Sequence, residues 1–101
     1  MVVTCSPKSK KLRTIGFYLE QNNPNPFNEL TTIRFSLPCQ SKVTIIITNS
    51  YGRVVDKIIS NLYDEGSYNL DFLADGLPKG TYFYHLITDK FADSREMELI
   101  K

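Results

Sequence analysis

Few side chains in this 101-residue sequence could carry out catalysis, and their spacing does not favour an enzyme. The single histidine, His85, lies in an alternating run with aromatic neighbours, which is typical of a strand residue rather than of a general base. A serine or cysteine nucleophile would need His85 as its base, and no G-x-S-x-G motif occurs. We therefore expect no catalytic residues.

The acidic residues also favour a structural interpretation. Asp64, Glu65, Asp71 and Asp75 fall in or near expected turns, where carboxylates commonly accept local backbone hydrogen bonds. Glycoside hydrolysis would need two carboxylates across a cleft, and a calcium site could combine Asn61 with the first two of these acids. Because no EF-hand spacing, Walker A loop or dinucleotide motif is present, we expect no metal and no cofactor. Binding of calcium or a glycan by the loops is left open.

The two cysteines, Cys5 and Cys39, do not have the spacing of metal ligands, and the sequence contains no C-x-x-C motif. In an oxidising compartment they could pair, which would tie the N-terminal segment to the loop after Leu37. A disulfide requires a short Cα separation that a sequence cannot supply. The pairing is therefore left open.

The composition excludes several classes of partner. The 12 basic and 11 acidic residues give a net charge of +1, which is too balanced for a broad surface that binds nucleic acid or anionic lipid. No stretch is long and apolar enough to span a membrane. With 42% hydrophobic and 12% aromatic residues, the chain can build one core and one domain.

The character of the sequence changes at Phe17. Residues 1–16 are polar, basic and aperiodic, which predicts a linker or tether, and residues 17–101 form the predicted domain. In this domain short alternating apolar runs are separated by Gly, Pro, Asn or Asp, and no window has a helical pattern. The spacing predicts an all-β, immunoglobulin-like antiparallel β-sandwich of about seven short strands. The expected strands are 17–19, 32–37, 42–48, 54–59, 68–72, 81–88 and 94–100.

Two of these segments carry more specific expectations. In the run 42–48 the alternation directs Val43, Ile45 and Ile47 inward. The run 81–88 is apolar on both faces, which is typical of a central strand. Residues 61–66 are expected to form a polar turn.

A series of motifs follows in a fixed order along the domain. It begins with LEQNNPNPFN at residues 19–28 and continues with TTIRFSLP at 31–38, YGRVV at 51–55, GSY at 66–68 and LPKGTYFY at 77–84, before MELIK closes the chain. In this order the motifs resemble the type A C-terminal sorting domain of type IX secretion, whose opening motif is usually written L-x-Q-N-Y-P-N-P-F-N. Asn23 stands in place of the usual Tyr, Glu29 in place of a common Pro, and Glu96 where a Lys is frequent.

The resemblance implies an address label rather than an enzyme. A cargo protein, encoded upstream of the domain, would cross the inner membrane by a separate signal. The folded domain would then be recognised by the outer-membrane translocon and be removed by a sortase-like peptidase. The implied location is the periplasm in transit, and then the cell surface or the extracellular space.

Within the domain we expect recognition to reside in the last strand, because an exposed strand edge can accept a further strand. The expected recognition residues are Glu96, Met97, Glu98, Leu99, Ile100 and Lys101, next to strand 81–86. An exposed final strand could also pair with a copy of itself in a strand-edge dimer. The other motif residues are interpreted as architecture, with Phe27 closing one end of the sandwich; they are Pro24, Asn25, Pro26, Phe27, Gly52, Gly80 and Tyr82.

The alternative interpretation is an immunoglobulin-like module that binds a protein or a carbohydrate. Such modules are appended to extracellular proteins, and similar short sandwiches occur in flagellar hook-capping proteins. Tyr18, Tyr51 and Tyr63 are the aromatic residues expected at the surface of such a module, and Lys101 would then have no role.

Overall fold

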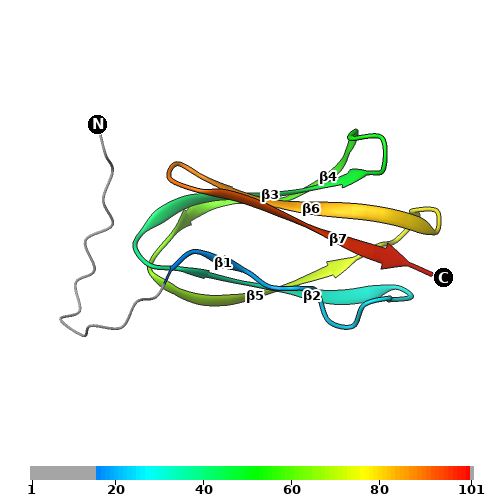
Figure 1. Ribbon diagram of the computed structural model, residues 1–101, viewed down its shortest axis with the longest axis horizontal. Helices are drawn as coiled ribbons and strands as arrows, with labels where there is room; N and C mark the ends of the chain where they lie inside the picture. The colour runs from blue at the N-terminus through cyan, green and yellow to red at the C-terminus, as the bar shows by residue number, and fades with distance from the viewer. Residues whose placement is uncertain (1–15, 101) are drawn as a thin grey trace.

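The computed structural model describes residues 16–100, and within this range it is all-β with no helix (Figure 1). The strands form two antiparallel sheets, with the orders β1-β2-β5 and β4-β3-β6-β7. The sheets pack face to face over one core, which confirms the predicted antiparallel β-sandwich. The strands are β1 (Tyr18–Leu19), β2 (Leu30–Leu37), β3 (Ser41–Asn49), β4 (Val54–Tyr63), β5 (Gly66–Leu73), β6 (Gly80–Thr88) and β7 (Ala92–Leu99).

Three expectations fall on residues outside this range. They concern the linker, of which only Gly16 is described, the pairing of Cys5 with Cys39, and Lys101. Cys39 itself is buried, with its sulfur 3.9 Å from the hydroxyl oxygen of Ser41. The domain boundary at residue 17 stays a prediction.

Alternate residues of the central strands fill the core. Val43, Ile45 and Ile47 of β3 are all 0% exposed, which confirms the predicted inward face. Strand β6 pairs with β3 on one side and β7 on the other, so the strand that is apolar on both faces is central, as predicted. Two sheets with one apolar face each can bury those faces only against each other, and this requirement produces the sandwich.

The prediction of a polar turn over residues 61–66 was wrong, because β4 continues to Tyr63 and only Asp64 and Glu65 separate it from β5. The Tyr63 ring packs edge-on against Phe35, with centroids 6.1 Å apart, and against Tyr68 at 4.9 Å. These aromatic contacts reach across the two sheets. They hold the polar end of β4 extended against β3, where the local sequence alone favours a turn.

The two G-x-Y segments have the same local structure where β5 and β6 begin. In each, a glycine with φ near +145° starts the strand, a region that L side chains rarely adopt: Gly66 has φ 143° and Gly80 has φ 148°. The tyrosine two residues later donates its hydroxyl proton to a carbonyl four residues upstream. Tyr68 bonds to Asp64 at 2.7 Å, and Tyr82 bonds to Pro78 at 2.6 Å. Each tyrosine thus fixes the turn that leads into its own strand.

Replacing Tyr82 with Phe removes the hydroxyl bond to Pro78 and leaves the buried ring in place. We expect the free energy of unfolding to fall by about 1 kcal/mol, measured by urea denaturation. Tyr51→Phe is the control, because Tyr51 is 92% exposed. Equal stability of the two variants would contradict a structural role for the Tyr82 hydroxyl.

Tyr84 is 0% exposed at the centre of the core, and burial raises the pKa of its hydroxyl to about 12. In the unfolded chain this group ionises near its ordinary pKa of about 10, so a rise in pH from about 10 to 12 favours unfolding. We expect the free energy of unfolding to fall by about 2 to 3 kcal/mol over this window through Tyr84. Denaturation curves of the wild type and Tyr84→Phe should converge towards pH 12. Parallel curves would show that the hydroxyl does not titrate in this way.

Candidate recognition surface at the C-terminal strand

Strand β7 divides the expected recognition residues between two faces. Met97 and Leu99 are each 1% exposed and belong to the core. Glu96 is exposed, Glu98 is half-buried, and Ile100 is 48% exposed on the side that faces solvent. The side chains that a partner could contact directly therefore come from alternate residues of this strand.

β7 lies at the edge of its sheet, but between Glu96 and Ile100 this edge is already occupied. Phe27 N donates to the Glu98 carbonyl at 2.9 Å, and Ile100 N donates to the Phe27 carbonyl at 2.8 Å. Glu98 N donates to Asn25 Oδ1 at 3.0 Å. The expectation that the last strand has an open edge is therefore wrong for this stretch, because the N-P-N-P-F motif pairs with it.

We call residues 21–27 the motif segment. The side chain of Gln21 extends its contact with β7 by one more bond, since Nε2 donates to the Glu96 carbonyl at 2.7 Å and to Asn22 Oδ1 at 2.8 Å. Just before the segment, Arg95 Nε donates to the Leu19 carbonyl at 2.6 Å. The start of the domain is thus bound along the whole second half of its last strand.

Phe27 anchors the motif segment in the core. It is 1% exposed, and its ring packs edge-on against Phe72 with centroids 6.3 Å apart. Pro24, Asn25 and Pro26 remain exposed, and both X-Pro bonds of the segment are cis. One aromatic side chain therefore enters the end of the sandwich, while the residues before it stay at the surface.

A buried asparagine, Asn22, stabilises the motif segment through hydrogen bonds. The sequence analysis did not identify this residue. Asn22 is 3% exposed, and its Nδ2 donates to the Pro24 carbonyl at 3.1 Å and to Thr31 Oγ1 at 3.0 Å. Thr31 is 1% exposed and donates to the same carbonyl at 2.8 Å. Buried polar groups are stable only when they are hydrogen-bonded. The position of Asn22 inside the family motif was the one available signal of this role.

The two glycines of the expected fold motif lie at the same end of the sandwich as the end of β7 (Figure 1). Gly52 has φ 84° in the β3–β4 turn, where Asn49 Oδ1 accepts bonds from the amides of Tyr51 and Arg53. Gly80 begins β6. Gly80 is the ladder partner of Leu99 in the C-terminal strand, whereas Gly52 lies in a neighbouring turn.

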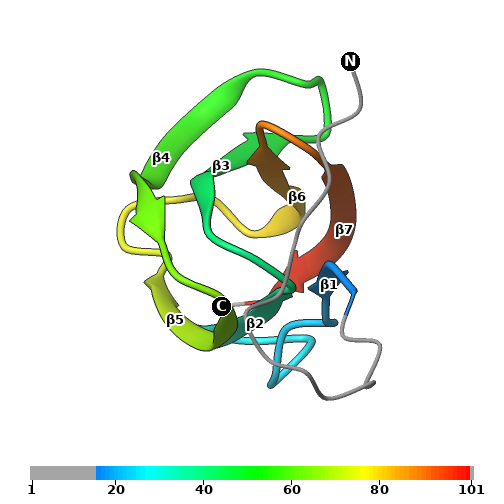
Figure 2. The same cartoon turned by 90° about the vertical axis from the view of Figure 1, so that its left-hand side faces the viewer.

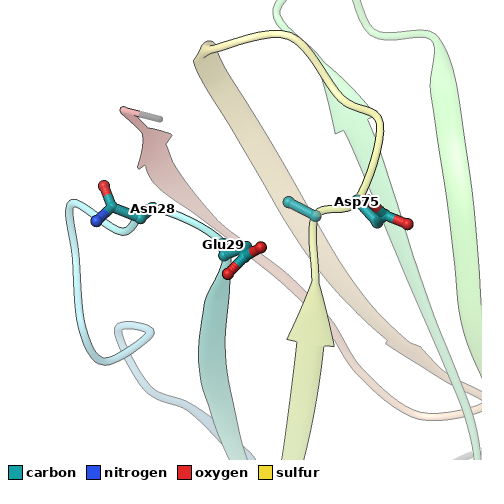
Figure 3. A pocket seen from close by; sticks show the side chains of 4 residues that line it. Asn28, Glu29 and Asp75 are labelled. Carbon is teal, nitrogen blue, oxygen red and sulfur yellow. The ribbon is translucent and has the colours of Figure 1, made fainter.

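A hollow of about 380 Å³ opens between the end of β5 and the start of β2, lined by Asn28, Glu29, Ala74 and Asp75 (Figure 3). Glu29 and Asp75 lie on opposite sides of it, and the Asp75 side chain points away from Glu29. Within residues 16–100 no group of three or more His, Cys, Asp or Glu side chains could hold a metal ion. The hollow is therefore a surface feature without a preformed ligand set.

The histidine and the surface tyrosines have structural surroundings. His85 lies between Thr48 and Ser94, with its Nε2 and Nδ1 at 2.9 Å and 2.6 Å from their hydroxyl oxygens. Of the tyrosines expected at the surface, Tyr63 packs between aromatic rings as described above. Tyr18 and Tyr51 are exposed, but Tyr18 lies in β1 and Tyr51 in the β3–β4 turn of the other sheet, so the three do not form one binding face.

The fold and this edge define a small β-sandwich module whose first and last segments are joined side by side. Residues 23–97 match the family model described as the secretion system C-terminal sorting domain. The chain belongs to this family, the C-terminal sorting domains of type IX secretion. None of the curated proteins matches the sequence.

Membership implies a sorting signal that interacts with the type IX secretion machinery and directs export to the cell surface or outside. No helix among the described residues is long and apolar enough to cross a membrane.

Asn25→Ala removes the acceptor for the Glu98 amide, and this hydrogen bond lies at the surface. We expect faster amide hydrogen exchange at Glu98 and a loss of about 1 kcal/mol of stability. Exchange measured by NMR would test this, with Asn28→Ala as the control because Asn28 is also exposed. Unchanged protection of the Glu98 amide would show that Asn25 does not hold the strand.

Proposed function

We propose that this domain directs a cargo protein encoded upstream of it to the type IX translocon in the outer membrane. The cargo passes through the periplasm, and a sortase-like peptidase then removes the domain. The domain itself catalyses no reaction. The observation that carries this proposal is the family match over residues 23–97.

We place the recognised signal at residues 96–101, next to strand β6. Met97 and Leu99 act through the core in this proposal, because their side chains are buried. The partner contacts Glu96, Glu98 and Ile100, whose side chains face outward. Glu98 is held in place by Thr81 of β6, which donates its hydroxyl proton to Glu98 Oε1 at 2.8 Å.

The contacts of β7 with the motif segment extend this surface. Asn25 and the two prolines around it are exposed beside Glu98. A partner that reaches Glu96 and Glu98 therefore also meets the motif segment. The proposed signal is a composite of both segments, which are joined by hydrogen bonds between residues 73 and 75 positions apart.

A fusion of residues 17–101 to a periplasmic reporter, expressed in a host with type IX secretion, tests the proposal. Deletion of 96–101 removes core residues as well as the signal, so it cannot separate folding from recognition. The decisive variants are removal of Lys101 alone and the double change Glu96→Ala and Ile100→Ala, because the latter two side chains are exposed. We expect each to reduce export while thermal unfolding of the domain stays unchanged.

Tyr51→Ala is the matched control, because Tyr51 is also exposed but lies in the β3–β4 turn. It should export as the wild type does. Full export of both decisive variants, or retention of the wild-type fusion in the periplasm, would exclude the proposed sorting role. Binding of the isolated domain on a glycan array would instead favour an interaction module.

A further inference from the structure

We propose that strand β5 is a second docking edge, which accepts an extended segment of a partner protein with lysine or arginine at alternate positions. This inference does not depend on the proposed signal at β7. Viewed along the sandwich, β5 lies on the opposite side from β7 (Figure 2). A partner at β5 would therefore not obstruct one that contacts the side chains of β7.

The other strand edges of the described domain are closed or irregular. The second half of the β7 edge, from Glu96 onward, is occupied by the motif segment, and β7 is held there to the first residues of the domain. Strand β4 pairs with β3 through two register shifts, between Ile45 and Ile46 and between Ile47 and Thr48. Such bulges interrupt the row of backbone groups and protect an edge from further pairing. β1 is only two residues long.

The edge of β5 is regular and unoccupied. Its eight residues pair with β2 without a register shift, and Ala74 N donates to the Glu29 carbonyl at 2.8 Å just beyond the strand. Because bonded and non-bonded pairs alternate in an antiparallel ladder, the amides and carbonyls of every second residue point away from β2. These residues are Ser67, Asn69, Asp71 and Leu73, and no hydrogen bond within residues 16–100 uses their backbone groups.

Most of the usual protection of an exposed edge is missing from β5, whose one charged residue is Asp71. The strand contains no proline, no lysine and no bulge. The side chains of Asp71 and Asn69 bond to β2 rather than covering the open edge. Asp71 Oδ1 accepts from the Thr32 hydroxyl at 2.8 Å, and Asn69 Oδ1 accepts from Arg34 Nε at 2.9 Å. The backbone of the edge is thus left accessible to an incoming strand.

Charge identifies the kind of segment that fits. Asp71 lies on β5, Asp64 and Glu65 precede it and Asp75 follows it, while residues 64–78 contain no lysine or arginine. The nearby Arg34 of β2 faces Glu20 at 4.0 Å. Within the described chain none of these four carboxylates forms a salt bridge. An incoming strand with basic side chains is attracted by this field, whereas a second copy would bring like charges together along the new pairing. Leu73, 57% exposed, adds an apolar contact beside the strand end.

The test uses the 101-residue chain and a blocked nine-residue peptide in which lysine alternates with threonine. We expect NMR amide shifts at the four outward residues of β5, and about tenfold weaker binding of the glutamate–threonine counterpart at low salt. Asn69→Pro removes one outward amide and should weaken binding about tenfold. Asn69→Thr changes the same side chain but keeps that amide, and should bind as the wild type does.

Several results would overturn the inference. Shifts that map to β7 instead of β5, equal affinity for the lysine and glutamate peptides, or equal binding by the two Asn69 variants each contradict it. A dimer seen by sedimentation that Asn69→Pro abolishes, without peptide binding, would assign the edge to a second copy. The wild-type shift map decides the question even if Asn69→Pro does not fold. Loss of export in the fusion assay bears on the sorting signal alone.

Discussion

The backbone pairing of Phe27 with the end of β7 is the interaction on which the rest of the domain depends. Its amide and carbonyl bond to Glu98 and Ile100, while its ring fills the end of the core. One residue thereby closes an edge, seals an end of the sandwich and fixes the first segment of the domain to the last. The buried amide of Asn22 shapes the turn that makes this possible, because it bonds to the Pro24 carbonyl.

The edge strands on the two sides of the sandwich differ in whether their outer backbone groups are covered. On one side the motif segment covers the backbone of β7, so what a partner meets there is a set of side chains. On the other side β5 presents backbone groups directly, with acidic residues around them. In the two proposals, recognition at the first edge would depend on the identity of side chains, and recognition at the second would depend mainly on strand geometry and charge.

Much of the fold could be predicted from the sequence because it follows from the local alternation of apolar and polar residues. The inward face of β3 and the central place of β6 follow from the period of two that every strand imposes. The end of β4 could not be predicted, since Tyr63 is held extended by rings of Phe35 and Tyr68 on other strands. The covered edge of β7 has the same cause: Gln21 and Glu96 meet only through the tertiary fold, and no local pattern indicates that they touch.

The distance along the chain between the motif segment and β7 determines when their joint surface forms during folding. Asn25 and Glu98 are 73 positions apart, and the intervening residues include strands β2 to β6. The joint surface is therefore absent from a nascent or partly folded chain and is assembled only when the last strand takes its place. A receptor that contacts both segments at once distinguishes a completed domain from an incomplete one without any separate checkpoint.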